Sequence, residues 1–304
     1  MRLSRFLLAG LTTIGLTTPV WAEDGYQLWL RYRPLDSALQ TQDRAHAASL
    51  IVDSDDSRVV AAASELDRAL AGMLGAAPAH DGSLSNAVLL GTAASPHISA
   101  LKLDLSGLGE EGYIVRTIPV DGRPTIVIAA NTGAGVLYGT FALIGEMQRG
   151  HAIDQINLRS APKLKLRVLD HWDNLNGHIE RGYAGDSLWD WWKLPDYKDP
   201  RYTDYARADA SVGINGAVLN NVNAVAASLT PEYIAKTAAL ADVFRPWGIK
   251  VYLSARFTAP MELGGLKTAD PLDPGVAAWW KAKADEIYKA IPDFGGFLDR
   301  KSVV

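Results

Sequence analysis

LRVLDHWDNLNGHIERGYAGDSLWDWW occupies residues 166–192 and decides both the expected fold class and the expected site. The alternating apolar run at 164–169 predicts a β-strand. A long loop follows, with four tryptophans, two histidines and several acidic and amide side chains. In α/β barrels, loops of this kind after a strand carry the functional residues. Aromatic faces beside carboxylates and amides indicate sugar binding, because the ring's C–H face stacks and its hydroxyls need hydrogen-bond partners.

Strands and helices alternate downstream of this loop. Strands are expected at 214–219, 249–254 and 294–298, and helices at 201–212, 230–245 and 273–290. Repeated strand–helix units predict a parallel sheet covered by helices, and the polar loops favour a (β/α)₈ barrel over a doubly wound sheet. Four units make half a barrel. We therefore expect residues 151–298 to be the N-terminal half of a (β/α)₈ TIM barrel that is truncated.

Residues 23–150 are predicted to form a small α/β accessory domain before the barrel. Asn131–Gly135 holds a Gly-x-Gly pattern, but Gly139 is one position too distant for a dinucleotide fingerprint, so no nucleotide site is expected. A linker is expected at 155–162. The predicted strands are 26–32, 48–52, 88–91, 112–117 and 125–129, and the predicted helices are 57–75 and 136–147.

Residues 1–22 have the pattern of a signal peptide. Arg2 and Arg5 precede an apolar run, Phe6–Leu16, that is too short to span a bilayer. Val20-Trp21-Ala22 predicts cleavage after Ala22. We expect an exported protein, periplasmic or extracellular, with no membrane span after cleavage; the alternative is an uncleaved anchor.

Composition excludes several classes of function. The net charge of −4 gives no electrostatic case for nucleic acid or for an anionic membrane surface. The absence of cysteine excludes disulfides, a thiol nucleophile and thiolate metal sites. His171 and His178 have no metal-like spacing with each other or with an acid pair. No cofactor is therefore expected.

Three segments resemble one known family. HWDNLNGHIERGYAG (171–185), NNVN (220–223) and IPDFGGF (291–297) are similar to the α-glucuronidases of glycoside hydrolase family 67. Residues 111–143 resemble the small α/β domain that precedes the barrel in several exo-acting glycoside hydrolases. The resemblance implies a hydrolase that removes α-1,2-linked glucuronic acid, or its 4-O-methyl form, from xylan-derived oligosaccharides. It also implies inversion, no metal, and a homodimer in the full-length enzyme.

The same resemblance implies which residues contact substrate. Trp172 matches a sugar-stacking tryptophan, and Val222 matches a residue that lines the uronic acid pocket. Glu180 and Arg181 belong to the IERGYAG motif, where they either contact the sugar or form an ion pair that shapes the loop. Asn223 is expected to bond hydroxyls or to cap its loop.

Other groups near these loops keep two interpretations. Asn221, like Asn223, is expected either to bond sugar hydroxyls or to cap its loop. Arg256 suits a uronate carboxylate, or is a solvated surface arginine. The cluster of Trp189, Trp191 and Trp192 is expected to pack the loop onto the barrel rather than to bind sugar.

No catalytic residue is expected in this chain. An inverting hydrolase needs a protonated carboxyl group and an opposed carboxylate about 6.5–9.5 Å away. The resemblance places the general acid a few residues beyond IPDFGGF and the base carboxylates on later strands. The chain instead reads LDRKSVV at 298–304, with Val304 at the position of the acid. We interpret 299–304 as a foreign tail.

The expected partner is a glucuronoxylan-derived oligosaccharide. The alternative is a non-catalytic carbohydrate-binding or regulatory protein that uses the aromatic loop 171–192.

Overall fold

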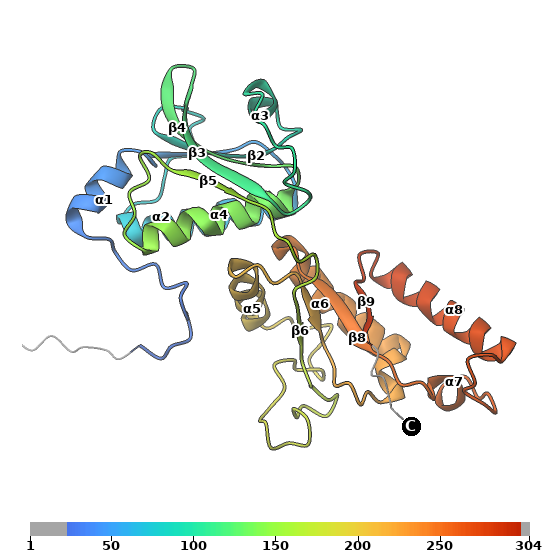
Figure 1. Ribbon diagram of the computed structural model, residues 1–304. Coiled ribbons are helices and arrows are strands. Elements are labelled where there is room, and N and C mark those ends of the chain that lie inside the picture. The colour runs from blue at the N-terminus through green and yellow to red at the C-terminus, as the bar shows by residue number, and fades with distance from the viewer. Residues whose placement is uncertain (1–22, 299–304) are drawn as a thin grey trace, which may run out of the picture.

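The structure is a computed structural model that describes residues 23–298. The expected signal peptide (1–22) and the expected foreign tail (299–304) lie outside the described residues. Figure 1 shows an N-terminal α/β part above a second part built from strand–helix units. Within the described residues, no helix is long and apolar enough to cross a membrane.

Five strands form the sheet of the N-terminal part, in the order β1-β2-β4-β3-β5. The β1–β2 and β2–β4 pairs are parallel, whereas β3 is antiparallel to both β4 and β5. The β3–β4 hairpin turns at Asp121 and Gly122, whose φ values of 50° and 75° suit a two-residue hairpin turn. The strands span Ser49–Val52 (β1), Ala87–Thr92 (β2), Tyr113–Val120 (β3), Arg123–Ala130 (β4) and Asn157–Ser160 (β5).

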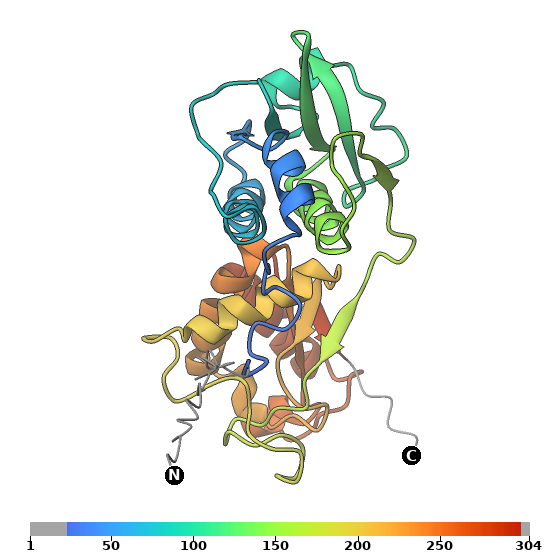
Figure 2. The same ribbon diagram turned by 90° about the vertical axis from the view of Figure 1, so that its left-hand side faces the viewer.

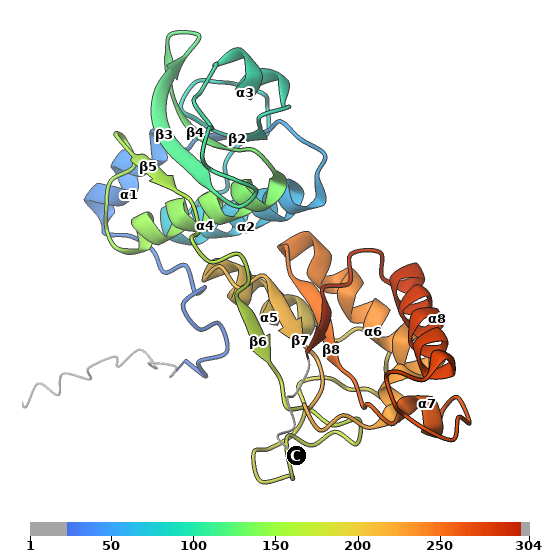
Figure 3. The ribbon, with the colours of Figure 1, turned by 45° about the vertical axis from the view of Figure 1, so that its right-hand side comes forward.

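Helices α2 and α4 cover the face of this sheet that points toward the second part (Figure 3). α2 (Ser57–Leu74) begins after Asp56, whose side chain accepts a hydrogen bond from Arg58 N, and ends at Gly75 with φ +74°. Both ends match the helix predicted at 57–75. The short helices α1 (Ser37–Arg44) and α3 (Pro96–Ala100) complete this part.

The Gly-x-Gly segment lets α4 (Gly133–Gln148) pack closely on the sheet. A Cβ atom on Gly135 would lie 2.4 Å from the carbonyl oxygen of Gly112, and one on Gly139 would lie 2.8 Å from Ile128 Cγ2. These glycines therefore serve helix–sheet contact.

The second sheet has four parallel strands in chain order, β6-β7-β8-β9. β6, β7 and β8 each lead into a polar loop and then a helix, which is the predicted strand–helix repeat of an α/β barrel. Asp199 and Asp273 cap α5 and α8, each followed by a proline in the first helical turn. The elements are β6 (Val168–Asp170), α5 (Pro200–Ser211), β7 (Gly216–Val218), α6 (Pro231–Phe244), β8 (Lys250–Ser254), α7 (Ala259–Glu262), α8 (Pro274–Ala290) and β9 (Gly296–Leu298).

The strand predicted at 26–32 is wrong, because this segment forms turns and extended chain. It crosses α5 instead of joining a sheet (Figure 2, dark blue). The Tyr26 hydroxyl donates to Asp204 (3.0 Å), and Trp29 Nε1 donates to Ser211 Oγ (2.7 Å). The alternating pattern therefore reflects side chains that anchor the segment to a helix.

Two further predictions near the junction need correction. The segment 155–162 is not simply a linker, because residues 157–160 form β5 and pair with β3. The strand predicted at 164–169 is shorter, because β7 offers partners only to Val168–Asp170. The boundary between residues 150 and 151 stays a prediction, with β5 lying in the first sheet.

A buried ion pair joins the two parts. The Glu65 carboxylate on α2 accepts from Arg207 Nε (2.8 Å) and Nη2 (2.9 Å) on α5. Glu65 is fully buried and Arg207 nearly so. The Tyr32 hydroxyl also donates to Glu65, and Asp204 pairs with Arg207 Nη1 at 2.7 Å. Charged groups this deep need several partners, and here the partners come from both parts of the chain.

Candidate functional site

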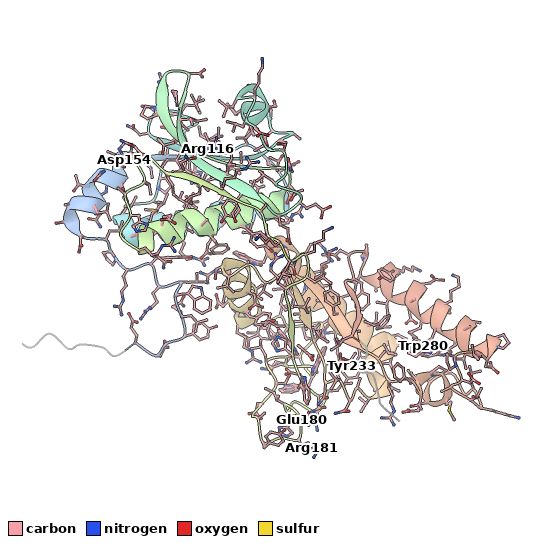
Figure 4. The ribbon with its side chains drawn as sticks, viewed as in Figure 1. Arg116, Asp154, Glu180, Arg181, Tyr233 and Trp280 are labelled. Carbon is pink, nitrogen blue, oxygen red and sulfur yellow. The ribbon has the colours of Figure 1, made fainter. Side chains whose placement is uncertain are left out.

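The candidate site lies on the loops that follow β6 and β7, at the carboxyl ends of the parallel strands. Figure 4 labels Glu180 and Arg181 on the loop below β6, and Tyr233 higher up on α6. This is the end of the sheet at which α/β barrels place their functional loops. The structure thus puts the predicted segment 171–192 where the sequence indicated.

The loop after β6 folds back on itself. Isolated β-bridges join Asp173 to Ile179 and His178 to Asp186. The buried Asp173 carboxylate accepts from the Ser187 hydroxyl and from Leu188 N at 3.1 Å, which ties the start of the loop to its end. These bonds fix the shape of the loop independently of any ligand.

Glu180 has a backbone conformation that few non-glycine residues adopt. Its φ is +52°, in the left-handed region. Its N–H donates to the Trp172 carbonyl (2.8 Å), and its carbonyl accepts from Asn174 Nδ2 (2.5 Å). Its Oε2 accepts from Asn221 Nδ2 (3.1 Å). Bonds from three residues therefore hold a strained glutamate in place, as is common in functional sites.

Asn221 connects the two loops. It is almost fully buried, and its N–H donates to the Asp173 carbonyl at 2.8 Å. Its Nδ2 donates to Glu180 Oε2 and, at 3.4 Å, to the Trp172 carbonyl. Its Oδ1 accepts from Asn223 N at 2.8 Å. The sequence predicted that Asn221 bonds hydroxyls or caps its loop, and did not predict its bonds to Trp172 and Glu180.

A cavity of about 520 Å³ opens between these loops and α6. Carboxylate, amide and hydroxyl groups share its wall with apolar surface from Leu175 and Ala224, a mixture that suits a sugar. Its polar wall comes from Asp173, Asn174, Asn176, Glu180, Asn220, Asn221, Ser228 and Tyr233. The sequence analysis did not single out Asn174, which lies within the 171–185 motif, or Tyr233, which lies in no motif.

The predicted site residues divide between this wall and the surface beside it. Glu180 lines the cavity, whereas Trp172, Arg181, Val222 and Asn223 do not. Trp172 is 40% exposed, and its Nε1 donates to Asp170 Oδ2 at 3.1 Å. The exposed Arg181 lies 3.6 Å from Glu180 Oε1. Val222 is half-buried and Asn223 is exposed on the neighbouring loop. Their sugar contacts stay predictions.

Two other candidates have partners within the protein. Arg256 Nε donates to Glu262 Oε1 at 2.6 Å, so its charge is already paired. Trp189 and Trp191 are buried and pack the loop, as predicted, but Trp192 is 64% exposed. Among the described residues, no group of histidine and acidic side chains has the arrangement of a metal site.

Behind the loop lies a buried acid–tyrosine–histidine chain. His171 Nε2 is 2.7 Å from the Tyr205 hydroxyl, which bonds Asp209. Burial raises the pKa of Asp209 to about 6, against the lowering effect of the Tyr205 bond. Burial lowers the pKa of His171, while the charges of Asp173 and Asp170 oppose that change.

Asp209 should therefore make stability depend on pH. The folded protein keeps its proton to about pH 6, whereas the unfolded chain releases it near pH 4. Stability should fall as pH rises through this window, by up to about 3 kcal/mol. Asp209→Asn should remove that fall. Urea unfolding of both proteins at pH 4 and pH 7 tests this, because their difference cancels the contribution of His171. Parallel pH profiles would contradict it.

Comparison with known proteins identifies the family of both parts. Residues 28–143 match the family model described as "Glycosyl hydrolase family 67 N-terminus", and residues 146–302 match "Glycosyl hydrolase family 67 middle domain". The chain is 34% identical to "Probable alpha-glucuronidase A" of Aspergillus clavatus, over 97% of this chain and 35% of the relative. It is 35% identical to "Alpha-glucuronidase A" of Emericella nidulans, over 95% of this chain and 35% of the relative. The chain thus spans about a third of the length of these curated relatives.

Solved structures show similarity of fold. A GH138 enzyme targeting pectin rhamnogalacturonan II aligns with TM-score 0.57 and 16% identity, covering 82% of this chain and 30% of that one. A family GH115 4-O-methyl-alpha-glucuronidase aligns with TM-score 0.53 and 14% identity, covering 80% of this chain and 34% of that one. Identities this low bear on the fold alone.

Proposed function

We propose that the loops after β6 and β7 form the sugar-recognition surface of an α-glucuronidase, because this chain belongs to glycoside hydrolase family 67. The substrate is a xylan-derived oligosaccharide that carries α-1,2-linked glucuronic acid or its 4-O-methyl form, and the reaction inverts the anomeric centre. The protein is exported. We assign no general acid or base to residues 23–298. Glu180, Asn221 and Trp172 bind and orient the sugar.

The observation that carries this proposal is the meeting of Trp172, Glu180 and Asn221. The Trp172 ring supplies an exposed apolar face. The Glu180 carboxylate supplies acceptors for sugar hydroxyls, fixed by Asn221 Nδ2 at 3.1 Å. Three residues from two loops are thereby held ready before ligand arrives, which lowers the entropic cost of binding.

Trp172→Ala should weaken binding of aldotetraouronic acid by about tenfold, because an aromatic stacking contact is removed. Isothermal titration calorimetry measures the affinity. Tyr183→Ala is the matched control, since Tyr183 is also exposed on this loop, whereas Trp172 is the residue whose carbonyl bonds Glu180 N and Asn221 Nδ2 at the cavity wall. Equal affinities for the wild type and Trp172→Ala would contradict the assignment.

Because no general acid or base is assigned to residues 23–298, the catalytic test uses a protein that continues this chain to the length of its curated relatives. Proton NMR of aldotetraouronic acid incubated with that protein separates the two functional classes. Release of glucuronic acid, with its first-formed anomer inverted, supports an inverting hydrolase. Binding with no release favours a non-catalytic carbohydrate-binding protein.

A further inference from the structure

A second cavity, of about 830 Å³, lies at the junction of the two parts of the chain. It shares no wall residue with the cavity beside Glu180. α4 and β5 form one side, and the end of α5 forms the other. Its size is in the usual range for small-molecule sites, which occur preferentially between domains. Its wall includes Trp29, Glu146, Arg149, Asn157, Arg159 and Ser211.

Trp29 gives this cavity a fixed aromatic surface. Its Nε1 donates to Ser211 Oγ at 2.7 Å, and its carbonyl accepts from Gln148 Nε2 at 2.6 Å. Despite these two bonds, Trp29 is 48% exposed to solvent. Because the indole is anchored at both its ring nitrogen and its backbone, little conformational entropy remains for a ligand to remove.

Planar charged groups lie on the α4 side. The Glu146 carboxylate pairs with the Arg149 guanidinium and with His151 Nδ1 at 2.5 Å. Hydrogen bonding to His151, and then to Arg149, lowers the pKa of Glu146. The Arg149 side chain is 58% exposed, so most of its donors stay accessible. Such a pair offers both donors and acceptors to hydroxyl groups.

The open edge of β5 adds backbone groups. Among residues 23–298, β5 is an edge strand whose one partner is β3. Thr117 N donates to the Ile156 carbonyl, so alternation in the antiparallel ladder turns the N–H and C=O groups of Asn157 and Arg159 away from β3. Both residues line the cavity. Two residues are too few for stable addition of a peptide strand, but they are enough to bond ligand hydroxyls.

We propose that this cavity is a second carbohydrate-binding site that takes a pyranose segment of a xylan-derived oligosaccharide. Trp29 stacks on the sugar ring, Arg149 and Glu146 bond its hydroxyls, and the β5 edge bonds the next residue along. The class of sugar rests on the proposed function. The site itself rests on the cavity, Trp29 and the open strand edge.

Fluorine NMR of the 304-residue chain, labelled with 5-fluorotryptophan, tests the site directly. Trp29→Phe identifies the Trp29 resonance by its loss. Xylotetraose should shift that resonance saturably in the wild type and equally in Trp172→Ala. In the Trp172→Ala background, Trp29→Ala should weaken xylotetraose binding by about tenfold. Trp192→Ala is the control, because Trp192 is exposed but lines neither cavity.

An unmoved Trp29 resonance at saturating sugar would overturn the proposal, and so would a shift that disappears in Trp172→Ala. Ser211→Ala removes only the hydrogen bond that anchors the Trp29 indole, so it shows whether a loss of affinity follows from loosening the segment. The site is also contradicted if Ser211→Ala loses as much affinity as Trp29→Ala and the sugar does not shift the Trp29 resonance. Failure of the proposed function looks different. In that case Trp172→Ala leaves binding unchanged while the Trp29 resonance still shifts.

Discussion

Arg207→Met should lower the free energy of unfolding by about 3–5 kcal/mol, because it leaves the Glu65 carboxylate buried without its main partner. Arg207 Nε and Nη2 bond both oxygens of that carboxylate, at 2.8 and 2.9 Å. Tyr32 and Arg68 also bond Glu65, but Arg68 is half exposed and its contact is longer, 3.2 Å. The remaining partners therefore compensate only in part.

Urea unfolding at pH 7 measures this loss, and a lower midpoint with unchanged slope identifies it as lost stability. Lys281→Met is the matched control, because the Lys281–Asp285 pair is also short (2.6 Å) but lies in solvent. Such a surface pair should cost no more than about 1 kcal/mol. The double variant Glu65→Leu/Arg207→Met should recover most of the loss, since no charge is then left buried. A cost equal to that of Lys281→Met would show that the pair does not hold the junction.

The sequence predicted most elements of the fold because their signals are local. Residues 57–75 follow the cap residue Asp56, have helical apolar spacing and end in a glycine, and the structure has the helix at Ser57–Leu74. The hairpin around Asp121-Gly122 is equally local. The strand–helix repeat from β6 to β9 also matches, since each unit has its own start and stop residues.

The failures concern segments whose partners are distant in sequence. Residues 26–32 alternate like a strand, but their partners are Asp204 and Ser211, roughly 180 positions later. β5 looked like a linker because only its pairing with β3 makes it a strand. Periodicity reports the shape of a segment and not the surface it meets.

The candidate site was predicted in the same uneven way. The density of aromatic and acidic groups marked the loop, and the family resemblance marked Trp172 and Glu180. Both sources left two roles open for Asn221, hydroxyl bonding or loop capping, since an asparagine in a polar loop usually caps its own turn. Its contacts with Trp172 and Glu180 exist only when the loop after β6 meets the loop after β7.

Asn221→Ala should therefore weaken binding of aldotetraouronic acid by roughly ten- to a hundredfold. The change deletes the donor that fixes Glu180 Oε2, so the sugar must order that carboxylate on binding, and a hydrogen bond to a charged group is worth about 1.5–3 kcal/mol. Asn221→Asp should be at least as damaging, because it places a second carboxylate where the donor to Glu180 now lies. Calorimetric titration gives both affinities.

The adjacent Asn220 separates a positioning role from a merely structural one. Asn220 is as deeply buried and also lines the cavity beside Glu180, but both polar atoms of its side chain bond the backbone of Ser254 on β8, Nδ2 at 3.0 Å and Oδ1 at 2.8 Å. Asn220→Ala should thus lose as much stability as Asn221→Ala while keeping the affinity of the wild type. If the two variants lost affinity in parallel, the loss would follow from general loosening of the sheet. If only Asn221→Ala lost it, the bridge between the two loops is what holds Glu180 and Trp172 in their binding geometry.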